Sequence, residues 1–162
     1  MKLLVIRHAI AVERGTSDVR DEDRPLTDDG KRRFREAARG LAQICARPDL
    51  LLSSPLLRAA STADIAAEAW GGISPVHEPV LARGRPTEII SMLSRHDATQ
   101  SIAIVGHEPT LSELLARLLG SRNGDPFALR KGGAALVDIP GPPADGGRLD
   151  WLMRPKILRK LA

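Results

Sequence analysis

A chain of 162 residues with 43% hydrophobic and 27% charged residues has the composition of a globular protein of one ordinary domain. Its net charge of +4 suits anionic ligands, but two Trp and two Phe are too few for the stacking platforms that nucleic acids usually require, which argues against nucleic acid as a partner. No stretch approaches the roughly 20 apolar residues that cross a bilayer, and the apolar run near the N-terminus is too short for a signal peptide, so we expect a cytoplasmic protein with no membrane partner.

The chain starts with a predicted buried strand that ends in two basic side chains. Residues 3–6 are all apolar, which is typical of a strand covered on both faces in a mainly parallel sheet, and Arg7 and His8 follow at once. Open α/β sheets bind ligands in the crevice at the carboxyl ends of their strands. This strand is therefore expected to deliver a cation and an imidazole to such a crevice. Residues 10–24 are polar without a clear period, and a connection of that length is usually functional or disordered.

The next part of the chain is predicted to form a helix, a strand and a second helix. Thr27 is a candidate N-cap for a helix whose apolar stripe runs from Phe34 to Cys45. A second strand covers 49–53, after which Ser54 is predicted to cap a helix with a mostly alanine buried face. Arg58 falls in the opening turns of that helix. The sequence thus places a second cation at a strand-to-helix junction.

The second half of the chain repeats this pattern and then changes. A further buried strand, 101–105, breaks at Gly106 into His107 and leads to a leucine-rich helix. The other predicted elements are an extended piece at 75–81, a helix at 86–96, short strands at 127–130, 134–139 and 149–153, and a helical turn at 156–161. Alternating strands and helices followed by a hairpin predict an α/β three-layer sandwich with a mostly parallel central sheet and helices on both faces, formed by a single domain over residues 1–162.

Three predicted junctions carry the side chains of a phosphate site. Arg7 with His8, Arg58, and His107 would all lie at one edge of the sheet if its strands are parallel. Two guanidinium groups can bind phosphoryl oxygens without a metal. One neutral imidazole can attack phosphorus, and the other can donate a hydrogen bond to a phosphoryl oxygen. Each junction alone also fits a solvated arginine or a structural histidine. Their agreement in position is what favours phosphate chemistry.

These motifs resemble those of the histidine phosphatase superfamily (phosphoglycerate mutase-like), and within it the small SixA-type phosphohistidine phosphatases. The matching segments, in order along nearly the whole chain, are Arg7-His8-Ala9, Arg24-Pro25-Leu26-Thr27 with Gly30, Ser53-Ser54-Pro55 to Arg58 with Thr62, and Gly106-His107-Glu108-Pro109. The resemblance implies a phosphoglycerate mutase-like fold and a nucleophile, His8, that becomes phosphohistidine. It also implies that Arg7, Arg58 and His107 bind the phosphate, with no metal and no cofactor.

The resemblance leaves the general acid open. SixA-type members imply a carboxylate from the loop before the Arg-Pro-Leu-Thr motif. That indicates Asp21 as a catalytic residue, with Asp23 and Asp18 as alternatives, although an acidic loop facing solvent explains the same residues. Glu78 lies roughly where larger branches of the family supply their acid, but it is not in a matching motif. Glu108 is expected to be a charge at a helix N-terminus rather than an acid.

The lack of an obvious acid bears on the substrate. Phosphohistidine can leave as neutral imidazole, whereas an alkyl phosphate leaves as an alkoxide that needs a positioned proton donor. We therefore expect a metal-independent phosphatase whose partner is a protein carrying phosphohistidine. The alternatives are a phosphomonoesterase of the same mechanism acting on a small phosphate ester, and a non-catalytic phosphate-recognition module. About 50 residues separate Arg58 from His107, which leaves little chain for a lid.

Overall fold

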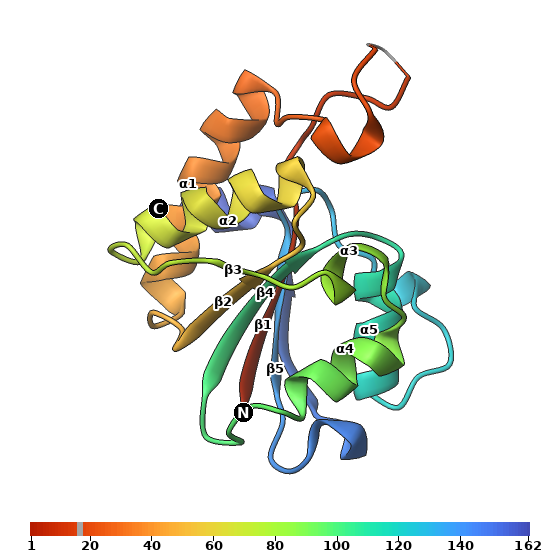
Figure 1. Cartoon of the computed structure of the whole chain (residues 1–162). Helices are drawn as coiled ribbons and strands as arrows, with labels where there is room; N and C mark the ends of the chain where they lie inside the picture. The colour runs from red at the N-terminus through yellow and green to blue at the C-terminus, as the bar shows by residue number, and fades with distance from the viewer. Residues whose placement is uncertain (16–17) are drawn as a thin grey trace.

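The computed structural model describes residues 1–15 and 18–162, and its centre is a six-stranded sheet (Figure 1). The strands lie in the order β3-β2-β4-β1-β5-β6. Their bounds are β1 Lys2–Arg7, β2 Leu50–Ser53, β3 Val76–His77, β4 Ser101–Gly106, β5 Ala134–Asp138 and β6 Arg148–Met153. β1, β4, β2 and β3 pair in parallel, while β5 is antiparallel to both β1 and β6. The predicted mostly parallel α/β sheet is confirmed.

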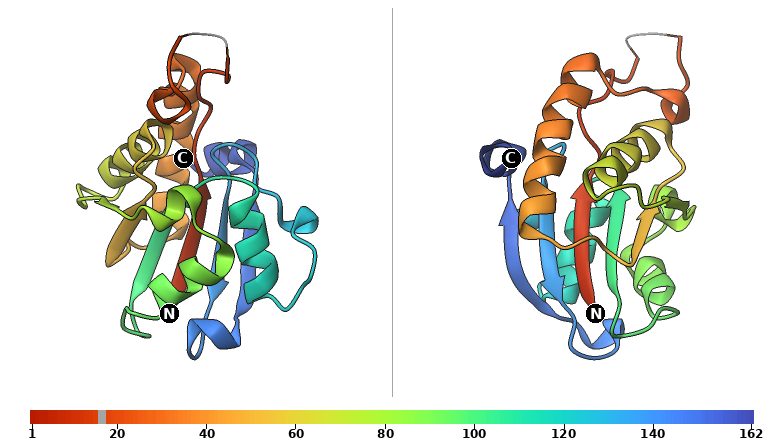
Figure 2. Two further views of the ribbon diagram at one scale, coloured as in Figure 1. Left: turned by 45° about the vertical axis from the view of Figure 1, so that its right-hand side comes forward. Right: turned by 90° about the vertical axis from the view of Figure 1, so that its left-hand side faces the viewer.

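Helices cover both faces of the sheet, as the two views of Figure 2 show. On one face lie α1 (Asp28–Ile44), α2 (Leu57–Ala69) and α6 (Pro155–Leu158). On the other lie α3 (Val80–Arg83), α4 (Pro86–Leu93) and α5 (Thr110–Leu118). Short 3₁₀ turns are η1 (Asp21–Asp23), η2 (Asp125–Phe127), η3 (Pro143–Asp145) and η4 (Arg159–Leu161). Among the described residues, none of these helices has the length and apolar character that crossing a membrane requires.

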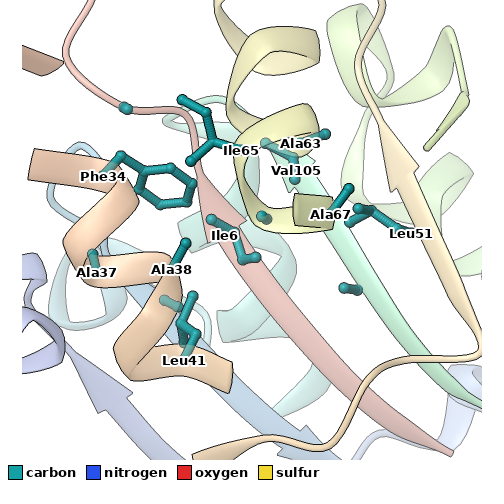
Figure 3. Close-up of a cluster of buried hydrophobic side chains, with 14 of the residues drawn as sticks. Ile6, Phe34, Ala37, Ala38, Leu41, Leu51, Ala63, Ile65, Ala67 and Val105 are labelled. Carbon is teal, nitrogen blue, oxygen red and sulfur yellow. The ribbon is translucent and has the colours of Figure 1, made fainter. Parts of the chain in front are cut away.

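Strand β1 is central and buried on both sides, as its unbroken apolar run predicts. Leu4 and Ile6 belong to the core under α1 and α2, whereas Leu3 and Val5 belong to the core under α4 and α5. All four side chains are at most 4% exposed. Figure 3 shows the first of these cores, in which Ile6 lies among side chains of α1 and α2. Each such side chain contributes about 1.5–3 kcal/mol of burial free energy, so the position of β1, and of the residues that follow it, is strongly fixed.

Two predicted extended segments differ in the structure. Residues 127–130 do not form a strand: η2 ends at Phe127, and the backbone of Leu129 is bound by side chains instead. Of the segment 75–81, two residues pair with β2, and the chain then turns into α3 so that Leu81 enters the core. The two differences have separate causes: the bonds to Leu129 come from Arg7 and Glu108, far away in sequence, whereas the turn into α3 is closed by local bonds such as that from the Leu81 N–H to the Glu78 carbonyl. The short strand β3 does lie at the edge of the sheet, as the prolines of this segment predict.

The first turn of α1 packs directly on the chain that follows His8. A Cβ on Gly30 would lie 2.1 Å from the carbonyl oxygen of Ile10, and the Thr27 N–H donates to the same oxygen at 3.0 Å. We expect Gly30→Ala to lower the free energy of unfolding by about 2 kcal/mol or more, because this overlap outweighs the helix propensity of alanine. Urea unfolding measures the difference. Gly141→Ala is the control, since a Cβ there meets nothing within 4 Å. Equal stability of the two variants would contradict the close packing.

Candidate active site

The predicted junctions meet at the carboxyl edge of the sheet. Arg7 and Gly106 end two adjacent parallel strands and are register partners, so His8 and His107 follow side by side. Their imidazole rings have centroids 5.1 Å apart and are inclined by 50°. Arg58 lies in the first turn of α2, which follows the neighbouring strand β2. The structure therefore brings together the four basic side chains that the sequence singles out.

His8 is held as a neutral imidazole with one nitrogen free to react. Its ring is almost fully buried, and Nδ1 lies 2.7 Å from the carbonyl oxygen of Ala9. A carbonyl oxygen can only accept, so this contact assigns the ring proton to Nδ1 and leaves a lone pair on Nε2. Burial, helped by the neighbouring positive charges, lowers the pKa of His8 to about 3. At neutral pH the side chain is thus uncharged, as a nucleophile must be.

The residues after His8 are tied to two other parts of the fold. The Ala9 N–H donates to Thr62 Oγ1 at 3.0 Å, and the Thr62 hydroxyl donates to the Arg58 carbonyl at 2.6 Å. From the other side, the Gly132 N–H donates to the His8 carbonyl at 3.1 Å. Gly132 has a φ of +76°, which glycine adopts without strain. The glycine-rich turn before β5 therefore supports the end of β1 directly.

Ser54 orients His107, although the sequence predicts that this serine caps a helix. The sequence predicts Ser54 as the helix cap, but α2 starts at Leu57 with Leu56 in the cap position. Ser54 Oγ instead accepts the Leu56 N–H at 3.2 Å and lies 2.8 Å from His107 Nε2. If the hydroxyl proton goes to Nε2, the proton of His107 is on Nδ1. Burial, with a smaller effect of the Arg58 charge, lowers the pKa of His107 to about 4.

Arg7 is positioned through a peptide group that Glu108 fixes. Arg7 Nη1 donates to the Leu129 carbonyl at 2.7 Å, and the Leu129 N–H donates to Glu108 Oε1 at 2.8 Å. The second oxygen of Glu108 accepts the Ser112 hydroxyl at 2.6 Å, at the start of α5. Burial lowers the pKa of Arg7, and the charge of Glu108 opposes this effect. Both oxygens of Glu108 are therefore used structurally.

Arg58 is bound by Asp21, the first candidate for the general acid. Arg58 is 5% exposed, and its Nη1 donates to the Asp21 carbonyl oxygen at 2.7 Å, while Nη2 lies 3.5 Å from Oδ2. The other carboxylate oxygen accepts from Arg14 at 3.0 Å and from Arg24 at 2.9 Å. The Arg14 hydrogen bond and the other guanidinium groups lower the pKa of Asp21 to about 2. In the free site this carboxyl group is ionised and holds no proton to donate.

The other acid candidates are less closely connected to the pocket. Asp23 pairs with Arg20 at 2.7 Å, and Asp18 is exposed. Glu78 follows β3 at the same edge of the sheet, where its N–H donates to the Ser53 carbonyl at 2.8 Å. Among these carboxylates, Asp21 is the one that the described residues connect to a basic side chain of the site.

Three buried nitrogen atoms of the site have no hydrogen-bond partner. They are Arg7 Nε, Arg58 Nε and His107 Nδ1, and they are all the buried side-chain polar atoms without a partner in residues 1–15 and 18–162. Leaving a buried donor unsatisfied costs about 1–3 kcal/mol. A ligand with several acceptor oxygens would offset this cost, and a tetrahedral oxyanion is such a ligand.

Fold and site together define an α/β protein that gathers two arginines and two histidines at the carboxyl edge of its sheet. The sequence profile of the histidine phosphatase superfamily (branch 1) matches residues 3–82. An uncharacterised protein of Picosynechococcus sp. is 35% identical over 136 residues, which are 82% of each chain. The chain belongs to the histidine phosphatase superfamily.

Solved structures agree with this assignment. A SixA protein of Agrobacterium tumefaciens, described as a candidate phosphohistidine phosphatase, is 27% identical with a TM-score of 0.80, over 94% of this chain and 96% of that one. The protein histidine phosphatase SixA in complex with tungstate is 24% identical with a TM-score of 0.85, over 98% of this chain and 99% of that one. The second similarity concerns the fold alone.

Three supporting residues were not assigned these roles from the sequence. Ser54 and Thr62 stand in matching motifs, but their contacts with His107 and Ala9 depend on which strands are neighbours. The order β2-β4-β1 is what brings them together, and no local pattern encodes it. No sequence pattern indicates the role of Leu129, because this residue acts through its peptide groups and not through its side chain.

The low pKa values of His8 and His107 predict an acid-sensitive fold. An unfolded histidine takes up a proton near pH 6.5, whereas the folded chain keeps these two rings neutral down to about pH 4 and pH 3. Stability is therefore expected to fall as the pH drops below 6.5, by about 1.4 kcal/mol per pH unit for each ring. Urea unfolding at about pH 7 and about pH 5 measures the loss of stability.

The double variant His8→Gln/His107→Gln should lose much less free energy of unfolding than wild type between these pH values. His77→Gln, at an exposed histidine, should lose as much as wild type, and a double variant that does so too would contradict the argument.

Proposed function

We propose that this protein is a metal-independent phosphatase that forms a covalent phosphohistidine on His8. The observation that carries the proposal is the state of His8: a neutral ring, with its proton on Nδ1 and a lone pair on Nε2. Around it are two arginines and a second imidazole, each with one buried nitrogen that has no hydrogen-bond partner. This is a set of groups suited to moving a phosphoryl group, whose charge is spread over its oxygens.

The reaction takes two displacements. The Nε2 lone pair of His8 forms a bond to phosphorus while the bond to the leaving group breaks and takes its electron pair with it. The positive charge that develops on the ring is stabilised by the Nδ1–H hydrogen bond to the Ala9 carbonyl. Water then attacks phosphorus, the P–N bond breaks, its electron pair returns to Nε2, and the water proton leaves with the phosphate or solvent. Arg7, Arg58 and His107 bind the phosphoryl oxygens in both steps.

The preferred substrate in this proposal is phosphohistidine on a protein. The free site offers no protonated carboxyl group, because Asp21 is ionised with a pKa of about 2. A phosphorylated imidazole protonated on its second nitrogen leaves as a neutral ring and does not need such a donor. The similarity to a SixA protein described as a candidate phosphohistidine phosphatase supports the same choice.

A small phosphate ester is the alternative substrate, and the contact between Asp21 and Arg58 favours it. A phosphate dianion that binds Arg58 would compete with Asp21 for the guanidinium group. Its negative charge would also raise the pKa of Asp21 and so help the carboxyl group to take up a proton. Asp21 would then act as the general acid for an alkoxide leaving group.

His8→Ala tests the mechanism. We expect turnover of both a phosphohistidine protein and phosphate esters to fall by at least about a thousandfold, because the nucleophile is lost. The wild-type enzyme, quenched during turnover, should carry an acid-labile, alkali-stable phosphoryl group that the variant lacks. His77→Ala is the control and should keep its activity. Activity of His8→Ala within a few-fold of wild type would exclude the covalent route.

Asp21→Asn separates the two substrate classes. If Asp21 is a general acid for esters, kcat for an alkyl phosphate should fall about a hundredfold, while phosphohistidine turnover changes little. Both assays use the same enzyme preparation, and Asp23→Asn controls for the loss of one charge in the same turn. Equal losses on both substrates would mean that Asp21 acts by holding Arg58 and not as an acid.

A further inference from the structure

A small cavity lies next to the nucleophile, on the α1 side of the sheet. Its volume is about 60 Å³, and its floor includes the buried residues Ala9, Phe34 and Gly132. Ala9 directly follows His8, and the Gly132 N–H donates to the His8 carbonyl. The cavity is therefore lined by the residue that follows His8 and by a residue that binds the His8 carbonyl. The proposed phosphoryl transfer does not involve this cavity.

The rim of this cavity is basic. Three of its lining residues are cations, namely Arg33, Lys131 and Arg159. Arg33 donates to Asp29 at 2.6 Å, but Asp29 is shared with Arg32, also at 2.6 Å. The lining residues themselves include no carboxylate.

The charge around the rim is not balanced. Glu36 lies 3.8 Å from Arg159 and is again shared with Arg32, at 3.4 Å. Lys131 has no ion pair within the part of the chain that the structure describes. Three arginines thus share two carboxylates here, and Lys131 adds a charge with no such partner. The N-terminal end of α1 lies beside them, where the charge of Asp28 is matched by that of Lys31. The cavity attracts a negatively charged group.

We infer that this cavity binds the carboxylate of an aspartate or glutamate side chain on the protein substrate, close to its phosphohistidine. The inference rests on the proposed function and adds a specificity determinant to it. A small cavity of about 60 Å³ suits a carboxylate with its methylene groups. The apolar floor of Phe34 and Ala9 suits the methylene groups, and the cationic rim suits the charge.

The position of the cavity makes simultaneous binding possible. Gly132 precedes β5, which starts opposite Ile6 at the carboxyl end of β1, and Pro155 follows the end of β6 at the same edge. A protein surface that presents a phosphoryl group to His8 must approach this edge. An acidic side chain on that surface would reach the rim, whereas a small phosphate ester would not touch it.

The test uses phosphohistidine peptides with and without a neighbouring acid. In one set, Asp is moved along the positions on either side of the phosphohistidine, and in the matched set Asn takes its place. For the best position we expect wild-type kcat/KM to favour the Asp peptide by about fivefold, mostly through KM, as for a partly exposed ion pair. The preference should shrink when the ionic strength rises.

Lys131→Gln and Arg159→Gln should each remove most of this preference. Lys160→Gln is the control, because it removes the same charge from the residue next to Arg159 without altering the lining of the cavity. The ratio of the Asp and Asn rates cancels any general loss of fold or activity, and p-nitrophenyl phosphate reports the catalytic centre separately. Inorganic phosphate as an inhibitor shows whether a free anion uses the same rim: its inhibition constant should be the same in Arg159→Gln as in wild type.

The outcomes separate the two proposals. An Asp preference that Lys131→Gln and Arg159→Gln abolish and Lys160→Gln retains supports the docking cavity. The docking cavity is overturned if wild type turns over Asp and Asn peptides equally at every position. It is also overturned if Lys160→Gln loses the preference to the same extent as the other two variants. Either result leaves the proposed function standing. Weaker phosphate inhibition of Arg159→Gln assigns the rim to a free anion and also overturns it. No turnover of any phosphohistidine peptide, with p-nitrophenyl phosphate still hydrolysed, overturns phosphohistidine as the substrate, and this inference with it, but leaves the phosphatase mechanism standing.

Discussion

Four basic side chains, two buried and two half-buried, gather at one edge of the sheet, and the rest of this structure depends on that constraint. Charged groups taken out of water cost free energy unless they are paired, and like charges repel one another. The two histidines meet this cost by losing their protons, as the low pKa values of His8 and His107 indicate. The two arginines cannot do so in practice, and each is held by an oxygen instead: Arg7 by the Leu129 carbonyl and Arg58 by Asp21.

The contacts around the site follow from the way in which each of these four side chains avoids an unpaired charge. Neutral histidines need ring partners: the Ala9 carbonyl fixes the tautomer of His8, and the Ser54 hydroxyl orients the ring of His107. The carbonyl that holds Arg7 belongs to a segment without sheet pairing, so Glu108 fixes it in turn. Around His8, the N-cap of α1, α2 and the turn before β5 all bind the few residues that follow β1. These residues lie where the central strand ends, and that strand is buried on both faces.

The sequence predicts some of these features well for a physical reason. A strand that is apolar on both faces can only be central, and parallel strands end at one edge, so the convergence of Arg7, His8, Arg58 and His107 follows from local patterns alone. Ser54 shows where such reasoning stops, because its partner depends on strand order. The segment 127–130 was predicted to be a strand because it looks extended locally, yet its hydrogen bonds go to side chains. The ionised state of Asp21 depends on three arginines that meet only in the folded chain.

The low basicity of His8 bears on the choice of substrate in the proposed reaction. Burial lowers the pKa of His8 to about 3, and a weakly basic imidazole leaves phosphorus readily when water attacks. In the proposed reaction an ester of an alcohol would have a poor leaving group, whereas phosphohistidine would exchange one imidazole for another. The arginines would stabilise the phosphoryl group while it moves between the two rings, which would leave the positioning of the donor ring as the main task of the protein.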